Sequence, residues 1–131
     1  MKQKNSQIEA ELSDNAAVIT VGDDSVFTSL AASLAEIRKQ SGVVGYILRS
    51  DTSAIIDLSE QEKVIDYAIL SSQIAESSGE MAKQFNLSDI ESVMVEGKNV
   101  KVLCMNMSEN RVSVFMEKTA THDLIIKRIM Q

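Results

Sequence analysis

Residues 59–85, SEQEKVIDYAILSSQIAESSGEMAKQF, form the longest stretch of the chain in which apolar residues recur at the spacing of an α-helix. Ser59 is followed by Glu62 in the pattern of a capping box. In that motif the hydroxyl and the carboxylate accept hydrogen bonds from each other's backbone N–H groups, which marks the start of a helix. We therefore expect one long helix that begins at Ser59.

This helix has three distinct faces, because successive residues are turned by about 100°. One face is bulky and apolar and suits packing on a sheet: Tyr67, Leu70, Ile74, Met81 and Phe85. A second face carries only small residues: Ala68, Ser72, Ala75, Gly79 and Ala82. The third face is polar apart from one isoleucine: Glu62, Asp66, Ile69, Gln73, Glu76, Glu80 and Lys83. Three faces predict three different neighbours.

The composition is that of a single soluble globule. The chain has 131 residues, of which 44% are hydrophobic and 24% are charged. Its net charge of −6 disfavours nucleic acid as a ligand, because no cluster of Lys and Arg offsets the repulsion of phosphate groups. No apolar run has the length of a membrane span or a signal peptide, and the single cysteine, Cys104, cannot form an internal disulfide. We expect a cytoplasmic protein.

Residues 25–131 predict a domain that mixes helices and strands. Helical spacing begins at Ser25, and a last short helix begins at Thr121 and turns Leu124, Ile125 and Ile129 inward. Strand-like runs occupy residues 43–49, 54–58, 90–96, 99–107 and 111–117. The last three are joined by short turns, so they form an antiparallel meander. Residues 99–107 are apolar on both sides, which predicts helices on both faces of one antiparallel sheet, an α+β sandwich.

The first 24 residues form an extension to this domain. Residues 1–15 are polar without a sustained period, which favours a mobile tail over a short helix. Residues 16–21, AAVITV, are β-branched and either add an edge strand or dock on the domain. We therefore divide the chain into an N-terminal extension, residues 1–24, partly flexible, and a domain at residues 25–131.

No catalytic signature is present, so we expect a protein that is not an enzyme and needs no metal or other cofactor. The five glycines do not form a phosphate-binding loop, and no calcium-binding loop occurs. His122 is the single histidine and lies in the first turn of the last predicted helix, where surface residues are common. Cys104 lies in the middle of a predicted strand, where a small buried side chain explains it.

Three segments together resemble the Roadblock family of dynein light chains, lysosomal scaffold subunits and bacterial and archaeal regulators of Ras-like GTPases. They are VVGYILRSDTSAIIDL at residues 43–58, the long helix with its small face, and DIESVMVEGKNVKVLCMNMSENRVSVFMEK at residues 89–118. The resemblance covers residues 25–130 and includes Gly45 within the first of these strands. It implies the order α-β-β-α-β-β-β-α, with the long helix on one face of a five-stranded antiparallel sheet and two helices on the other. A longin-like or profilin-like domain is the nearest alternative to this Roadblock/profilin-like sandwich.

The resemblance also implies a dimer in which long helices lie side by side and sheets join through the strand after that helix. The interface residues would be Ala68, Ser72, Ala75, Gly79, Ala82, Val93 and Val95. The alternative for the small face is tight packing on the subunit's own sheet or exposure to solvent. Either a homodimer or a heterodimer fits.

By the same resemblance the dimer binds a Ras-like small GTPase or assembles a larger complex, without hydrolysing GTP itself. The residues expected to contact that partner are Glu62, Asp66, Ile69, Gln73, Glu76 and Glu80, because an isoleucine within a charged helical face suits a protein interface. The alternative is a solvated face with one ordinary exposed isoleucine. The alternative function is that of a trafficking adaptor of the longin or profilin type that binds peptides.

Overall fold

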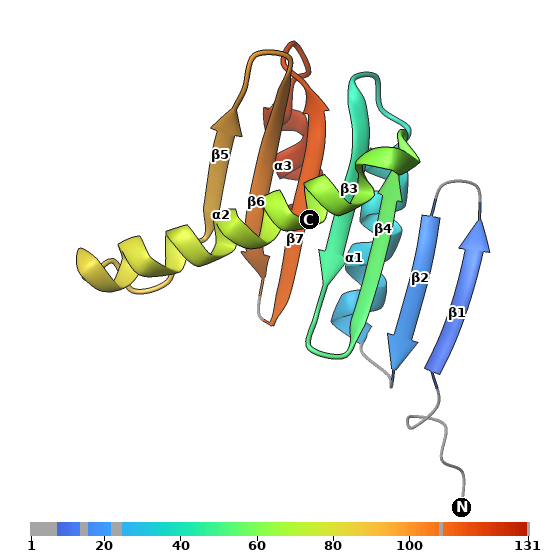
Figure 1. Ribbon diagram of the computed structural model, residues 1–131, viewed down its shortest axis with the longest axis horizontal. Coiled ribbons are helices and arrows are strands. Elements are labelled where there is room, and N and C mark those ends of the chain that lie inside the picture. Colours follow the sequence, from blue (N-terminus) through green and yellow to red (C-terminus); the bar gives the residue numbers. More distant parts are fainter. Residues whose placement is uncertain (1–7, 14–15, 22–24, 108, 131) are drawn as a thin grey trace, which may run out of the picture.

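The computed structural model describes residues 8–13, 16–21, 25–107 and 109–130. Its strands form one antiparallel sheet of seven strands in the order β1-β2-β4-β3-β7-β6-β5 (Figure 1). The strands are β1 Ile8–Ser13, β2 Ala16–Val21, β3 Val43–Arg49, β4 Ser53–Leu58, β5 Ser92–Glu96, β6 Val100–Met107 and β7 Asn110–Glu117. The helices are α1 Ser25–Ile37, α2 Val64–Gln84 and α3 His122–Met130, and a short 3₁₀ turn, η2 Gln61–Lys63, precedes α2.

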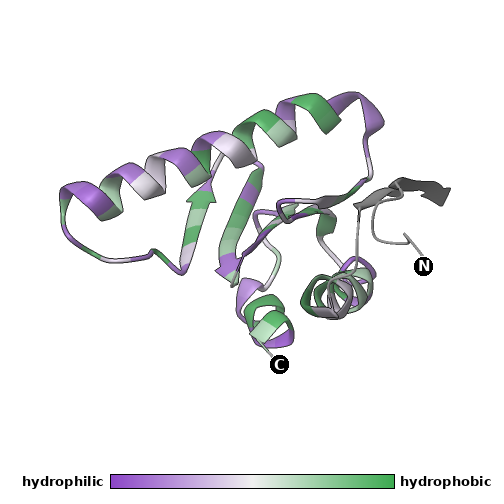
Figure 2. Ribbon diagram, turned by 90° about the horizontal axis from the view of Figure 1, so that it is seen from below, coloured by the Kyte–Doolittle hydropathy of each residue, from purple (hydrophilic) through white to green (hydrophobic). Residues whose placement is uncertain are grey.

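The long helix α2 covers one face of the sheet, and α1 and α3 lie on the opposite face (Figure 2). This arrangement confirms the predicted α+β sandwich, with its five antiparallel strands β3 to β7 and its helices in the predicted order. The sheet then continues beyond β4 through two further strands, β2 and β1. The predicted five-stranded sheet is therefore the central part of a wider one.

The first strand corrects the expectation of a mobile tail at residues 1–15. Residues 8–13 form β1, which pairs with β2, and β2 pairs in turn with β4. The sequence IEAELS alternates apolar residues with glutamate or serine, a period of two that is typical of a strand and that a search for helical spacing overlooks. Of the two alternatives for residues 16–21, the structure shows a strand, β2, which lies between β1 and β4 and is therefore not at the edge of the sheet. The remaining residues of the expected tail, 1–7 and 14–15, lie outside the described residues.

Each face of the sheet has its own apolar core, because side chains alternate along a strand. Along β7, Val112, Val114 and Met116 pack toward α1 and α3, whereas Phe115 packs toward α2. All four are fully buried. The core on the α1 and α3 side is the larger of the two, and the core under α2 is centred on Ile47, Leu58, Ile74, Val102 and Phe115.

The start of α2 differs from the predicted capping box. The positions that precede η2 and α2 make no side-chain cap hydrogen bond, and α2 itself begins at Val64. The Ser59 hydroxyl instead accepts a hydrogen bond of 2.7 Å from Nη2 of Arg38. Arg38 also donates to the carbonyl of Val43 and pairs with Asp57 at 3.3 Å. The prediction of a capping box was wrong because Arg38, which follows α1, binds the Ser59 hydroxyl.

Gly45 is required where β3 and β4 approach each other closely. The register of β3 against β7 shifts between Val43 and Gly45. A Cβ atom at Gly45 would overlap the Asp57 carbonyl oxygen and the Leu58 side chain. The glycine in the first strand of the family-like segment is therefore explained by the packing of this chain.

Helix α3 buries fewer residues than its sequence predicts. Ile125 and Ile129 are buried against the core, as expected. Leu124 was expected to face inward but is 58% exposed. A helix of nine residues that lies on a sheet turns one narrow stripe toward it, and Leu124 lies outside that stripe.

Candidate partner-binding surfaces

The first half of α2 is fixed to the sheet by an aromatic stack. The ring of Tyr67 lies on the ring of Phe115, with centroids 4.5 Å apart and planes inclined by 13°. Ile74 is buried nearby, and Val64 and Leu70 pack against the same core. These contacts involve the part of the bulky face that was predicted to meet the sheet.

The second half of α2 runs past the edge of the sheet at β5 (Figures 1 and 2). Met81 and Phe85 belong to the same bulky face as Tyr67, but they are 44% and 67% exposed. Their expected contact with the subunit's own sheet is therefore wrong. The reason is geometric, because β5 is the last strand and the helix outreaches it.

Strand β5 leaves one edge of the sheet open. It pairs with β6, and its other side has no strand beside it in the described part of the chain. Val93 is half-buried against the core under α2, whereas Val95, further along the strand, is 38% exposed. The open edge and the projecting part of α2 lie at the same end of the molecule (Figure 1).

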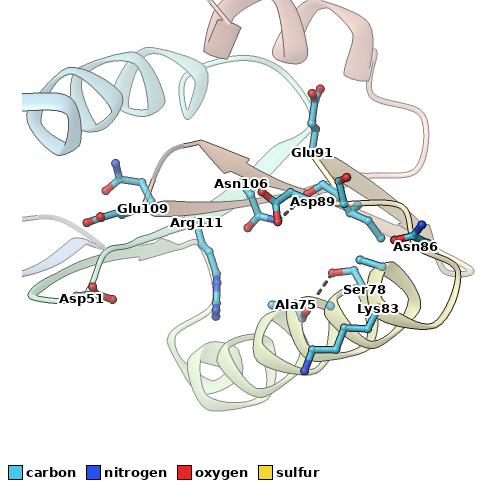
Figure 3. Close-up of a pocket in the computed structure, with 15 residues that line it drawn as sticks. Asp51, Ala75, Ser78, Lys83, Asn86, Asp89, Glu91, Asn106, Glu109 and Arg111 are labelled. Carbon is cyan, nitrogen blue, oxygen red and sulfur yellow. Dashed lines mark hydrogen bonds between the residues drawn. The ribbon is translucent and has the colours of Figure 1, made fainter.

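A groove of about 1180 Å³ runs between the second half of α2 and one end of the sheet (Figure 3). One wall is the small face of α2, through Ala75, Gly79 and Ala82. The other wall is formed by Asp51 and Glu109 in the turns that follow β3 and β6, by residues 86 and 88–91, and by the adjoining ends of β6 and β7. Three of the five small residues thus face the groove. Of the other two, Ala68 packs against the subunit's own core, and the Ser72 hydroxyl accepts a hydrogen bond of 3.4 Å from Arg49.

The groove is lined by charges of both signs. Its lining residues include four carboxylates, those of Asp51, Asp89, Glu91 and Glu109, and two cations, those of Lys83 and Arg111. In Figure 3, Arg111 extends from the sheet toward α2. These residues were missed in the sequence, because they come from separate turns that only the fold brings together.

The segment that closes the groove is held in a defined conformation. Asn86 follows α2 with a φ of 54°, the left-handed conformation that ends many helices. The N–H of Leu87 then donates to the carbonyl of Ala82 at 2.9 Å. The Asn106 side chain donates to the carbonyl of Ile90 at 2.8 Å and ties the segment to β6.

The polar face of α2 points away from the sheet, as predicted. The six residues expected to contact a partner, of which Glu62 lies in η2 just before the helix, are all exposed: Glu62, Asp66, Ile69, Gln73, Glu76 and Glu80. Ile69 is 52% exposed, and Ile65, one turn earlier, is 72% exposed. Ile65 was not nominated, although its spacing from Ile69 places both on one side of the helix. Two isoleucines surrounded by carboxylates form the outer surface of the first half of α2.

The two side chains considered for catalysis lie on opposite faces of the sheet. Cys104 packs against the core under α2 and hydrogen-bonds Ser113 at 3.4 Å, and burial raises the pKa of its thiol. His122 opens α3 on the other face, where its Nδ1 lies 3.0 Å from Nζ of Lys101. A pairing of this cysteine with this histidine is therefore excluded. Among the described residues, no three His, Cys, Asp or Glu side chains come together in a way that could hold a metal ion.

No helix in the described part of the chain combines the length and the apolar character needed to cross a membrane.

No protein-family model matches the sequence, and no curated protein matches it. Solved structures, by contrast, match its fold. A Roadblock/LC7 domain from Streptomyces avermitilis superposes with a TM-score of 0.61, covering 82% of this chain and 88% of that one at 13% identity. The chain has the Roadblock fold.

Two MglB structures agree with this assignment. MglB of Myxococcus xanthus has a TM-score of 0.64 at 16% identity, with 84% of this chain and 86% of that chain covered. The gliding protein MglB of Thermus thermophilus has a TM-score of 0.66 at 13% identity, with 86% and 90% covered. The predicted resemblance to Roadblock proteins is thus confirmed at the level of the fold. None of these three structures is a longin or profilin domain.

Proposed function

We propose that this chain is a non-enzymatic, homodimeric regulator or scaffold for a Ras-like small GTPase, built on a Roadblock-type domain at residues 25–131. The observation that carries the proposal is the projection of α2 past β5, with the apolar side chains of Met81 and Phe85 exposed on it. A helix that outreaches its own sheet, next to an open strand edge, is incomplete as a monomer.

A second copy would complete both features at once. If the β5 edges of two copies pair antiparallel, the joined sheet continues beneath each projecting helix. Met81 and Phe85 would then pack on the partner's sheet, together with Val95 at the joint. Burying one such side chain contributes roughly 1.5 to 3 kcal/mol. The four side chains of Met81 and Phe85 in a symmetric pair supply a substantial part of a stable interface.

The groove would accommodate the partner's α2. Helices pack at interaxial distances of about 8 to 10 Å, and small residues at the contact favour the shorter distance. Ala75, Gly79 and Ala82 line the wall of the groove that α2 provides. The carboxylates, Lys83 and Arg111 that line it offer partners to the polar residues of a helix that lies there.

The outer face of α2 is the proposed GTPase contact. Ile65 and Ile69 supply the apolar centre, and the carboxylates of Glu62, Asp66, Glu76 and Glu80 surround them. This arrangement favours a GTPase surface with an apolar centre and a basic rim, because opposite charges speed the encounter. Regulation would act on the GTPase's own switch segments, in the cytoplasm, with no metal or cofactor contributed by this chain.

The dimer is tested by adding a charge to the groove. A Cβ atom at Gly79 meets no atom within 4 Å, so Gly79→Glu leaves the subunit itself undisturbed. Gln73→Glu adds the same charge on the opposite flank of the helix and is the matched control. In sedimentation velocity we expect the unmodified chain and Gln73→Glu to be dimers and Gly79→Glu to be a monomer with unchanged circular dichroism. A monomeric unmodified chain, or a dimeric Gly79→Glu, would contradict this interface.

GTPase binding is tested separately by calorimetry. The probes are purified Ras-like GTPases from the source organism, loaded with GDP or with a non-hydrolysable GTP analogue. We expect saturable binding of one nucleotide form, weakened at least tenfold by Ile69→Asp. The control, Val26→Asp, changes an exposed apolar residue on the opposite face of the sheet. Absence of binding to every GTPase tested in either nucleotide form would refute the assignment.

A further inference from the structure

The hairpin of β1 and β2 occupies the edge of the central sheet that lies farthest from β5. Strand β2 pairs with β4 over five consecutive residues, from Ala16 opposite Asp57 to Thr20 opposite Ser53. Strand β4 therefore has a neighbour on each side, β3 and β2. Without the hairpin, the central sheet would have two open edges, β4 and β5.

An open β4 would be a strong template for pairing with other chains. Its sequence, SAIIDL, places two adjacent isoleucines in a strand with one charged residue. That residue, Asp57, is already engaged by Arg38 at 3.3 Å. A strand that is β-branched, nearly neutral and unpaired on one side is the kind that joins sheets edge to edge.

The hairpin replaces this edge with an acidic one. Strand β1 becomes the outermost strand, and two of its six residues are Glu9 and Glu11. Pairing of β1 with β1 of another copy would bring four glutamates into adjacent strands, and like charges across a strand pair are destabilising. Charged residues on an outer strand are a common protection against this pairing.

We propose that the hairpin is an edge cover that limits assembly of this protein to the β5 end of its sheet. A subunit with two joining edges can add further subunits without limit, whereas a subunit with one joining edge closes as a two-fold pair. That this protein closes as a pair rests on the proposed function, in which two β5 edges join. That the hairpin covers β4 does not depend on it. If β5 stays unpaired, the cover still prevents two β4 strands from joining.

The test compares two truncations of the full chain. Deletion of residues 1–22 removes the hairpin, and deletion of residues 1–7 removes only what precedes β1. Sedimentation velocity at increasing concentration measures the mass of each. We expect the shorter deletion to match the full chain, and the longer deletion to form larger species whose mass rises at least twofold with concentration.

A rescue variant separates an uncovered edge from a failure to fold. Ala54 is the second residue of β4 and pairs with Ile19 of the hairpin. In the chain without residues 1–22, Ala54→Lys places a charge on the uncovered strand, and we expect it to restore the mass of the full chain. The proposal is overturned if the truncated chain keeps the mass of the full chain, or if it aggregates and Ala54→Lys does not reverse this.

The test of the edge cover needs no GTPase, and its outcome does not depend on whether the full chain is a dimer. The mass of the full chain decides whether the β5 edges pair, and the difference between the full and the truncated chain decides whether the hairpin covers an edge. A monomeric full chain whose truncated form doubles in mass would refute the proposed dimer and support the edge cover.

Discussion

The ring of Tyr67 stacks on that of Phe115 at a centroid distance of 4.5 Å, and this contact joins α2 to the centre of the sheet. Phe115 is fully buried, while Tyr67 is half-buried above it. The position of the projecting part of α2 therefore depends on a joint near the beginning of the helix.

Replacing Tyr67 with alanine should destabilise the fold. Loss of a large aromatic side chain from a packed site costs about 3 to 5 kcal/mol when it is fully buried, so we expect about 2 to 3 kcal/mol here. Urea denaturation measures this free energy of unfolding. Ile65→Ala on the exposed side of the same helix is the control and should change it by less than about 0.5 kcal/mol. Equal losses for the two variants would contradict the role of the stack.

Replacing each of two glycines with alanine should change the stability of the fold in opposite directions. At Gly45 the new methyl group would overlap the Asp57 carbonyl oxygen, so we expect a loss of about 1 to 3 kcal/mol. At Gly79 the methyl group meets no atom within 4 Å, and alanine in a helix is favoured over glycine by up to about 1 kcal/mol. Thermal denaturation of both variants at one protein concentration measures the difference. A Gly45→Ala variant as stable as the unmodified chain would show that β3 and β4 can separate without cost.

The contributions of Lys101 and His122 to the free energy of unfolding should depend on each other. Lys101 is 4% exposed, and its ammonium group lies 3.0 Å from Nδ1 of His122. Because an ammonium group has only donors, the imidazole nitrogen accepts this bond. His122→Leu leaves a buried cation without that acceptor, and we expect a loss of about 1 to 3 kcal/mol.

Combining the two changes tests this coupling. The double variant Lys101→Met with His122→Leu removes both polar partners and should recover most of the loss, because neither partner is then left unpaired. Urea denaturation of the four chains gives the interaction energy. Strictly additive losses would show that the two side chains act independently.

Stability should fall at alkaline pH because of Tyr46. Burial, followed by the nearby charge of Asp57, raises the pKa of Tyr46 to about 12 from its ordinary value of 10.0. Between these values the unfolded chain loses the phenolic proton while the folded chain keeps it, so unfolding becomes easier as pH rises. The slope from this group is at most about 1.4 kcal/mol per pH unit.

Tyr46→Phe removes the ionisable group and should flatten that part of the profile. Urea denaturation at intervals from about pH 9 to about pH 11.5 measures the slope for both chains. Below about pH 10 the free energies of unfolding of the unmodified chain and the variant should change with pH in parallel. Parallel profiles at higher pH as well would show that Tyr46 titrates alike in the folded and unfolded chains.

The order of helices and central strands was predictable because local patterns specify each of them. The helical spacing of residues 59–85 and the alternation in residues 111–117 are visible within single segments. The pairing of β2 with β4 was not, since it joins segments separated by all of α1 and β3. The start of α2 was mispredicted for a similar reason, because Arg38, which follows α1, comes from a distant segment of the chain.

Of the candidate partner-binding surfaces, one was predictable from local sequence and the others were not. The exposed face with Ile69 follows from the period of one helix, and the structure exposes every residue nominated there. The groove could not be predicted, because Asp51, Lys83 and Arg111 line one groove only after three separate segments have folded together. The exposure of Met81 and Phe85 depends on where the sheet ends, and no local pattern encodes the width of a sheet.

The N-terminal hairpin also sets a length scale. Neighbouring strands are about 4.8 Å apart, so two joined sheets of this width would place their outermost β1 strands on the order of 60 Å from each other. In the proposed dimer the two hairpins would then lie at opposite ends of one continuous sheet. The outer faces of both α2 helices would lie between these two ends.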